Sequence, residues 1–206
     1  MDLVDALASL LAPPRCAVCG AGCGPDSVLC RSCYGALCGL RSLFSTAPGL
    51  DVVWSAAPHD GVARDLVAAL KFRRLLPVAR LLAARICAAA PPGLIGATLV
   101  PVPPAPMRLL RRGFDPADEI ASALAAITGL ALERCLTRGD GPRQVGRPRA
   151  VRLRRPPSVR ASAPVAASAL LVDDVHTTGA TLGTCAKALR RAGAERVAAV
   201  TFARAL

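Results

Sequence analysis

The chain has few aromatic residues, only two lysines and no long apolar run. Phe, Trp and Tyr make up 3% of the 206 residues, which disfavours a nucleic-acid interface built on extensive base stacking. No apolar run reaches the roughly 18 residues that a membrane-spanning helix requires, so we expect no membrane insertion. The first residues include Asp2 and Asp5 and lack the basic cluster of a secretory signal, and the sequence therefore predicts a cytoplasmic protein.

Positive charge is abundant and uneven. The formal net charge is +12, and 24 of the 26 basic residues are arginine. Residues 138–160 hold eight arginines and a single acidic residue, Asp140. Such a stretch attracts polyanions, either nucleic acid or a small molecule that carries pyrophosphate. An arginine-biased composition would explain the overall excess equally well, but explains its local concentration less well.

Nine cysteines are present, and six of them lie within residues 16–38. In a chain without secretory features this argues for metal binding over disulfides. Two Cys-x-x-Cys knuckles supply the four thiolates of a tetrahedral zinc site, which would be structural because no coordination position stays open. Cys23 or Cys38 could replace one ligand, and an iron–sulfur cluster is the alternative. The expected ligands of the zinc are Cys16, Cys19, Cys30 and Cys33.

The most informative motif spans residues 169–181. An apolar run, Ala169–Val172, is typical of a buried parallel strand, and Asp173 and Asp174 follow it directly. The next residues, Thr177-Thr178-Gly179-Ala180-Thr181, open a predicted helix. Ligands of open α/β sheets bind at the carboxyl ends of strands, and a helix N-terminus with hydroxyls nearby binds phosphate. The two carboxylates can accept hydrogen bonds from sugar hydroxyls or hold Mg²⁺. An aspartate-capped corner alone would explain one carboxylate, but not two with this loop.

A second apolar segment, residues 97–102, precedes three arginines on what we expect to be a loop: Arg108, Arg111 and Arg112. Arginines at the carboxyl end of a strand can clamp pyrophosphate through paired hydrogen bonds. The alternative is a basic surface loop without a ligand.

Apolar periodicity predicts alternating strands and helices after residue 48. This order indicates an α/β fold with a parallel, doubly wound sheet. We expect an N-terminal zinc-binding module at residues 1–48 and an α/β domain at residues 49–206, with a long loop over residues 137–165. The predicted strands cover residues 52–57, 97–102, 130–136, 169–174 and 196–203. The predicted helices cover residues 62–72, 77–89, 116–128 and 181–192, with Asp115 as an N-cap.

The order of these motifs resembles the ComF family, which comprises the competence protein ComF and its GntX-type relatives. The resemblance covers nearly the whole chain and implies a type I phosphoribosyltransferase fold after a zinc-ribbon-like start. It departs at Asp115-Pro116, where the family usually has Asn-Gln, and at His176, where the family usually has an aliphatic residue. The motifs that carry it are the cysteine knuckles, Ala69-Leu70-Lys71-Phe72, Val100-Pro101-Val102-Pro103, Arg111-Arg112-Gly113-Phe114, Arg143-Gln144-x-Gly146 and Val172-Asp173-Asp174-Val175-x-Thr177-Thr178-Gly179-Ala180-Thr181.

The resemblance implies a site for 5-phosphoribosyl-1-pyrophosphate (PRPP). Asp173 and Asp174 would be the catalytic pair that holds the ribose hydroxyls and positions Mg²⁺. Arg143 and Gln144 would lie on a flexible loop that closes over the ligand. The remaining PRPP-binding residues would be Thr177, Thr178, Gly179, Ala180 and Thr181 at the 5′-phosphate and Arg108, Arg111, Arg112 and Lys71 around the pyrophosphate.

Two functions stay open at this point. The chain could transfer phosphoribose from PRPP to an unknown acceptor, in a role linked to DNA uptake. Alternatively it could bind PRPP, a nucleotide or single-stranded DNA without catalysis, alongside proteins of the competence machinery. No residue stands out as a general base, which suits a displacement driven by electrostatic stabilisation of the leaving pyrophosphate.

Overall fold

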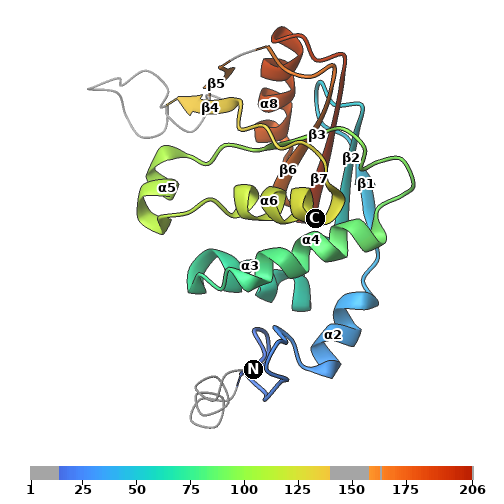
Figure 1. Ribbon diagram of the computed structural model, residues 1–206, viewed down its shortest axis with the longest axis vertical. Helices are drawn as coiled ribbons and strands as arrows, with labels where there is room; N and C mark the ends of the chain where they lie inside the picture. The colour runs from blue at the N-terminus through green and yellow to red at the C-terminus, as the bar shows by residue number, and fades with distance from the viewer. Residues whose placement is uncertain (1–13, 140–157, 163, 206) are drawn as a thin grey trace.

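A five-stranded sheet forms the centre of the computed structural model, which describes residues 14–139, 158–162 and 164–205 (Figure 1). The strand order is β1-β2-β7-β6-β3. Strand β1 is antiparallel to β2, and the other neighbours are parallel, so the sheet is mixed and mostly parallel. The strands are β1 (Leu43–Ser45), β2 (Val52–Pro58), β3 (Thr98–Pro101), β6 (Ser168–His176) and β7 (Arg196–Arg204).

Helices cover both faces of this sheet. Successive side chains of its strands point to opposite faces, and the side chains on both faces are apolar. Leu170 and Val172 of β6 join the core under α3, α4 and α6, whereas Ala169 and Leu171 join a second core with α8. Such continuous apolar strands are what a sheet buried on both faces requires. Figure 1 shows α8 on the opposite side of the sheet from α4 and α6. These helices are α3 (Gly61–Arg73), α4 (Pro77–Ala89), α6 (Pro116–Thr128) and α8 (Ala180–Arg191).

The helix ends follow their local sequence. The Asp115 side chain caps α6 by accepting a hydrogen bond from the Ala117 N–H at 3.1 Å, and Pro116 occupies the first turn. Gly129 ends α6 in the left-handed conformation that glycine adopts without strain. The predicted cap and bounds of this helix are therefore confirmed. In the described part of the chain, no helix combines the length and apolar character needed to cross a membrane.

Two predicted segments differ from the structure. Residues 106–112 form a short helix, α5 (Pro106–Arg112), where we expected a loop. Pro106 presets the first turn, and the Leu and Arg residues after it favour helix. In place of the predicted strand at 130–136, Leu132 forms a bridge with Leu99, and Leu136 begins the next strand, β4 (Leu136–Gly139).

The predicted long loop at residues 137–165 is wrong at both ends. Strand β4 (Leu136–Gly139) pairs antiparallel with β5 (Ser158–Ala161). The reason is packing, since Leu136 is buried in the core beside α8 and Val159 packs against the same core. Residues 140–157 lie outside the described residues, and with them the predicted loop residues Arg143 and Gln144.

The cysteine-rich segment packs on the helices of the α/β core. It includes α2 (Arg31–Cys38), whose Leu37 is buried in the same core as α3 and α4. The Arg73 guanidinium on α3 donates to the carbonyl of Ala17, and Arg85 on α4 donates to the carbonyl of Leu40 at 2.6 Å. These contacts tie the cysteine segment to the helices that cover one face of the sheet.

Shortening one buried side chain on strand β6 should test this core. Leu170 on β6 is fully buried, so Leu170→Ala should lower the free energy of unfolding by about 2–5 kcal/mol in urea titrations. Leu110→Ala is the matched control, because the Leu110 side chain is 79% exposed and its loss should change stability by less than about 0.5 kcal/mol. Equal losses in the two variants would contradict the packing described above.

Candidate functional site

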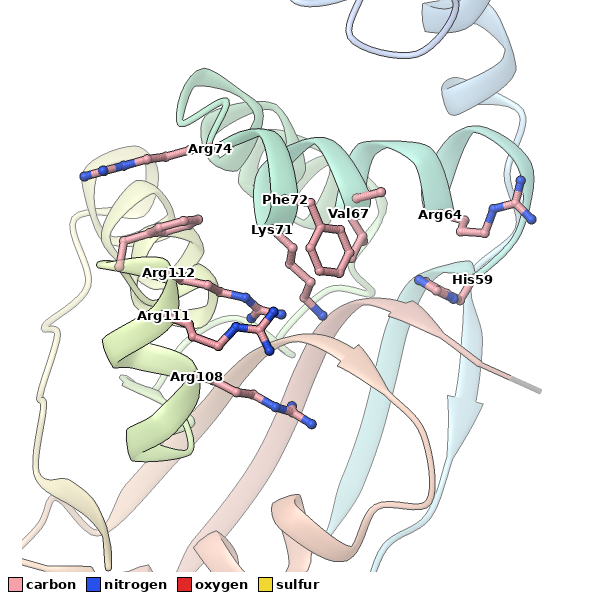
Figure 2. Close-up of a pocket in the computed structure, with 11 residues that line it drawn as sticks. His59, Arg64, Val67, Lys71, Phe72, Arg74, Arg108, Arg111 and Arg112 are labelled. Atoms are coloured by element: carbon pink, nitrogen blue, oxygen red, sulfur yellow. The ribbon is translucent and has the colours of Figure 1, made fainter.

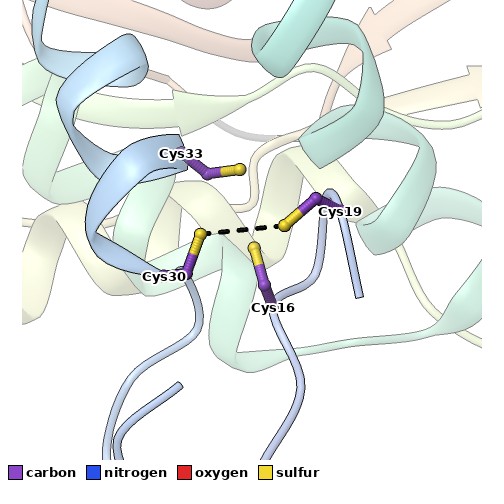
Figure 3. A group of neighbouring side chains, drawn as sticks. All are labelled: Cys16, Cys19, Cys30 and Cys33. Atoms are coloured by element: carbon purple, nitrogen blue, oxygen red, sulfur yellow. Dashed lines mark hydrogen bonds between the residues drawn. The ribbon is translucent and has the colours of Figure 1, made fainter. Parts of the chain in front are cut away.

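Four cysteine thiols converge on one point beside α2 (Figure 3). All four Sγ atoms lie within 4.8 Å of one another, and those of Cys19 and Cys30 are 3.7 Å apart. A tetrahedral zinc ion with Zn–S bonds of about 2.3 Å separates its thiolates by about 3.8 Å. Cys16, Cys19, Cys30 and Cys33 could therefore hold one zinc ion, as the sequence predicts.

Each pair of cysteines is positioned by a tight turn. The Gly20 N–H donates to the carbonyl of Cys16 at 3.0 Å, which closes the first knuckle, and Gly20 has a φ of 73°. Cys30 is the N-cap residue of α2, and Cys33 lies in the first turn of that helix. The two knuckles thus present their sulfur atoms toward each other without any long side chain having to be ordered.

The charges of the cluster favour a cation. Burial raises the pKa of Cys16, but hydrogen bonds from backbone N–H groups, chiefly those of Cys19 and Cys30, outweigh it and lower the pKa to about 6. Burial and the neighbouring thiols raise the pKa of Cys33 to about 12. Because one thiolate opposes ionisation of the next, the full set of thiolates needs a positive ion among them.

The two spare cysteines of this segment stand apart from the cluster. The Cys23 thiol donates to the carbonyl of Ser27 at 3.1 Å, and Cys38 is exposed at the end of α2. The spacing of the four clustered sulfurs is that of ligands around a single ion. Iron–sulfur clusters distribute four thiolates over two or more irons, so the whole set would be spread further apart.

A second candidate site is a cavity of about 370 Å³ at the carboxyl ends of β3 and β6. It has an acidic and a basic side. Asp173 and Asp174 come from β6, and Asp115 comes from the start of α6. The predicted site residues that line this cavity are Lys71, Arg108, Arg112, Asp173, Asp174, Thr177 and Thr181.

The loop between β6 and α8 depends on Gly179. This residue has a φ of 74° and forms the N-cap of α8. A Cβ atom there would lie 2.8 Å from the Cβ of Ala47 and 3.0 Å from Nε2 of His176, so no larger residue fits without movement. The Thr178 hydroxyl accepts a hydrogen bond from the Ala180 N–H at 3.5 Å. The predicted loop residues therefore form a compact turn with Thr177 and Thr181 on the cavity.

His176 lies directly beside this turn. Its side chain is buried, and Nδ1 lies 2.9 Å from the Arg204 guanidinium and 3.1 Å from the Ser45 hydroxyl. Because a guanidinium only donates, Nδ1 is the accepting nitrogen. Burial and Arg204 lower the pKa of His176, which keeps the ring neutral.

Two carboxyl groups on the acidic side of the cavity have raised pKa values. Nζ of Lys71 lies 2.7 Å from Oδ1 of Asp174 and links the two sides. Burial, and then the Asp174 carboxylate, raise the pKa of Asp173 well above its usual value. Burial raises the pKa of Asp115 to about 7, with smaller contributions from Asp118 and Asp174. Asp115 was predicted only as a helix cap, and no spacing in the sequence placed it beside the acidic pair.

A wider cleft of about 700 Å³ adjoins this cavity (Figure 2). Lys71, Arg108 and Arg112 line both, whereas Arg111 lines the cleft and not the acidic cavity. Two further residues of the cleft, Phe72 and Phe114, belong to motifs of the family resemblance. No pattern in the sequence indicates the others, which are His59, Arg64, Val67, Ala68 and Arg74.

Metal analysis of the purified protein should find one zinc ion per chain. Cys30→Ser should abolish stoichiometric binding, because it removes one of four ligands. Cys38→Ser is the matched control and should keep the metal, since this exposed thiol lies outside the cluster. A wild-type protein without metal, or equal loss in both variants, would contradict the assignment. Zinc should also dissociate as the pH falls, because protons compete for the thiolates.

The raised pKa of Asp115 should appear in the pH dependence of stability. Between an unfolded-state pKa of about 4 and the folded value of about 7, the native state binds more protons, so stability should fall as the pH rises through this window. Asp115→Asn keeps a capping side chain and should flatten that slope by at most about 1.4 kcal/mol per pH unit. Urea unfolding at pH 5–8 without magnesium measures it, with the exposed Asp26→Asn as control. An unchanged slope in Asp115→Asn would refute the raised pKa.

No protein-family model matches this chain, and a search of curated proteins finds no significant match to it. The functional interpretation therefore depends on the residues themselves. These are the four-cysteine cluster, the acidic cavity at the end of β6, and the cationic cleft beside it.

Proposed function

We propose that the acidic cavity binds PRPP together with Mg²⁺, and that the chain is a phosphoribosyltransferase-like protein of the ComF kind with a type I phosphoribosyltransferase fold. One observation carries the proposal. The Asp173–Asp174 pair, Thr177 and Thr181 share a single cavity with Arg108 and Arg112. Groups suited to ribose hydroxyls, a phosphate and a pyrophosphate therefore meet within about 370 Å³.

The 5′-phosphate would lie at the turn that begins α8. The first N–H groups of a helix have no partner within the helix and carry the positive end of its dipole. Gly179 allows close approach of the backbone, and Thr177 and Thr181, which both carry hydroxyls, line the same cavity. This arrangement supports binding of a phosphate group at the turn.

The ribose hydroxyls would be held by the acidic pair. The Asp174 carboxylate forms an ion pair with the Lys71 ammonium, with Nζ 2.7 Å from Oδ1. Asp173 accepts a hydrogen bond from the Asp174 N–H at 2.8 Å. Both carboxylates are thus held in place by contacts within the protein. Fixed carboxylates at a strand end give directional acceptors for a pair of neighbouring hydroxyls.

The pyrophosphate would face the basic side. Arg108 and Arg112 line the acidic cavity from α5, and Lys71 approaches from α3. Guanidinium groups bind phosphate oxygens through paired N–H donors, and such bonds strengthen as charge develops on a leaving group. Arg111 lines the adjoining cleft and would lie at the edge of this set of basic residues.

The donor set fits Mg²⁺. Mg²⁺ prefers carboxylate and phosphate oxygens and retains waters. Burial, and then neighbouring carboxylates, raise the pKa values of Asp173 and Asp115, so a cation close by would stabilise their ionised forms. Asp173 and Asp174 would hold the ion, and bound Mg²⁺ would neutralise charge on the pyrophosphate.

Transfer requires the bond between C1′ of the ribose and the pyrophosphate oxygen to break, with the electron pair leaving on pyrophosphate. A bond then forms between C1′ and a nucleophilic atom of the acceptor, which loses its proton. Arg108 and Arg112 would stabilise the departing charge, and the Thr177–Thr181 turn would keep the 5′-phosphate fixed while C1′ moves.

Titration calorimetry with PRPP tests the proposal. Binding should require Mg²⁺, and Asp174→Asn should weaken it at least about tenfold, because a charge-assisted contact is lost. Glu195→Gln is a control at an exposed carboxylate away from the cavity and should bind like wild type. Thermal unfolding of each variant checks the fold.

Wild-type binding that is absent, or that is indifferent to both Mg²⁺ and Asp174→Asn, would refute the PRPP site. Release of pyrophosphate in the presence of candidate acceptors separates an enzyme from a binding protein that uses the same site.

A further inference from the structure

The cleft beside the acidic cavity is strongly cationic. Among the described residues, no carboxylate lines it. Lys71 is paired with Asp174, and Arg64 lies 3.4 Å from Asp65. None of the ion pairs formed by the described residues involves the remaining arginines of the cleft, which are Arg74, Arg108, Arg111 and Arg112.

An exposed aromatic ring lies among these cations. Phe72 near the end of α3 is 74% exposed, and the Arg112 guanidinium lies 5.5 Å from its ring centroid. Arg74 lies 5.9 Å from the ring of Phe114, which is buried. A phenyl ring with a guanidinium beside it offers a planar surface on which an aromatic ligand can stack.

The cleft and the acidic cavity are joined. Lys71, Arg108 and Arg112 belong to both, so a ligand in the cleft would lie next to a ligand in the cavity. Figure 2 shows the arginines of α5 extending from one side and Lys71 and Phe72 descending from α3 on the other. His59 lines both the cleft and the cavity, and burial and Lys71 lower its pKa, so the positive charge of the cleft comes from Lys71 and the arginines.

We propose that this cleft is the acceptor subsite and takes a planar heteroaromatic ring that carries a negative charge, either a carboxylate or a phosphate. The acceptor role rests on the proposed PRPP function, whereas the binding of such rings does not. Phe72 and Arg112 would stack on the ring, and Arg74 and Arg111 would bind the negative group. Once pyrophosphate has left C1′ with the electron pair, a ring nitrogen forms a bond with C1′ and releases its proton to water.

Matched pairs of probes test the charge requirement. Orotate and uracil share a ring and differ by a carboxylate, and AMP and adenosine differ by a phosphate. Titration calorimetry of the full chain should show the charged member of at least one pair binding about tenfold or more tightly than its neutral partner. A preference confined to orotate or to AMP identifies the charged group. Equal affinities within both pairs would overturn the proposal.

Variants outside the acidic cavity locate the binding. Phe72→Ala and Arg74→Gln change exposed side chains, and each should weaken the preferred probe about tenfold while PRPP affinity stays within about twofold. Arg80→Gln removes an exposed arginine of α4 that lines neither cavity and should have no effect. Unchanged probe affinity in both cleft variants would overturn the assignment of the cleft.

The two proposals fail separately. If PRPP does not bind but the charged probe binds and depends on Phe72, the cleft is a binding site for anionic rings and the PRPP function is refuted. If PRPP binds and no small probe does, the acceptor proposal is refuted. In that case an oligothymidylate that binds with steep salt dependence would assign the cleft to a polymer instead.

Discussion

Burial of strand β6 is the constraint on which the rest of this structure depends. It lies between β7 and β3 and is covered by helices on both faces. Its apolar residues hold it in the centre of the sheet, and its carboxyl end borders the acidic cavity. The carboxylates of Asp173 and Asp174 follow the apolar run without a break, so they emerge in partly buried surroundings. There the free energy of a charge depends strongly on its neighbours.

The basic side chains around the strand end follow from that constraint. The two neighbouring, partly buried carboxylates repel each other and are poorly solvated, and both effects raise the pKa of Asp173. Lys71 offsets part of this at Asp174, while the arginines of α5 stand across the cavity without a carboxylate partner among the described residues. Opposite charges are thus held apart by the fold rather than neutralised. A ligand that carries phosphate groups and binds a divalent cation would satisfy both sides, which is the physical basis of the proposed function.

The cysteine cluster contributes to the same site at a distance. Helix α3 carries Lys71 and Phe72, and its neighbouring residue Arg73 donates to the carbonyl of Ala17, next to Cys16. Leu37 of α2 is buried with residues of α3 and α4 in one core. Ordering the cysteine segment around an ion would therefore stabilise the helix that forms one wall of the cavity and the cleft.

The sequence by itself determined the local features of this protein. The apolar runs predict β2, β6 and β7, Asp115 with Pro116 marks the start of α6, and two Cys-x-x-Cys knuckles predict the four-sulfur cluster. These features depend on neighbours in the chain, through strand periodicity, helix capping and knuckle geometry. The acidic pair and its loop could be placed at a strand end for the same reason.

Only the tertiary structure decided how separate segments combine. It brings Asp115 beside Asp174, and it places Arg111 on the cleft while Arg112 borders both cavities. It also pairs β4 with β5, which lie on either side of residues 140–157 in the chain. The raised pKa values of Asp173 and Asp115 and the exposure of Phe72 also depend on the tertiary structure. Burial and charge proximity arise from contacts between residues far apart in the chain, and no local pattern records them.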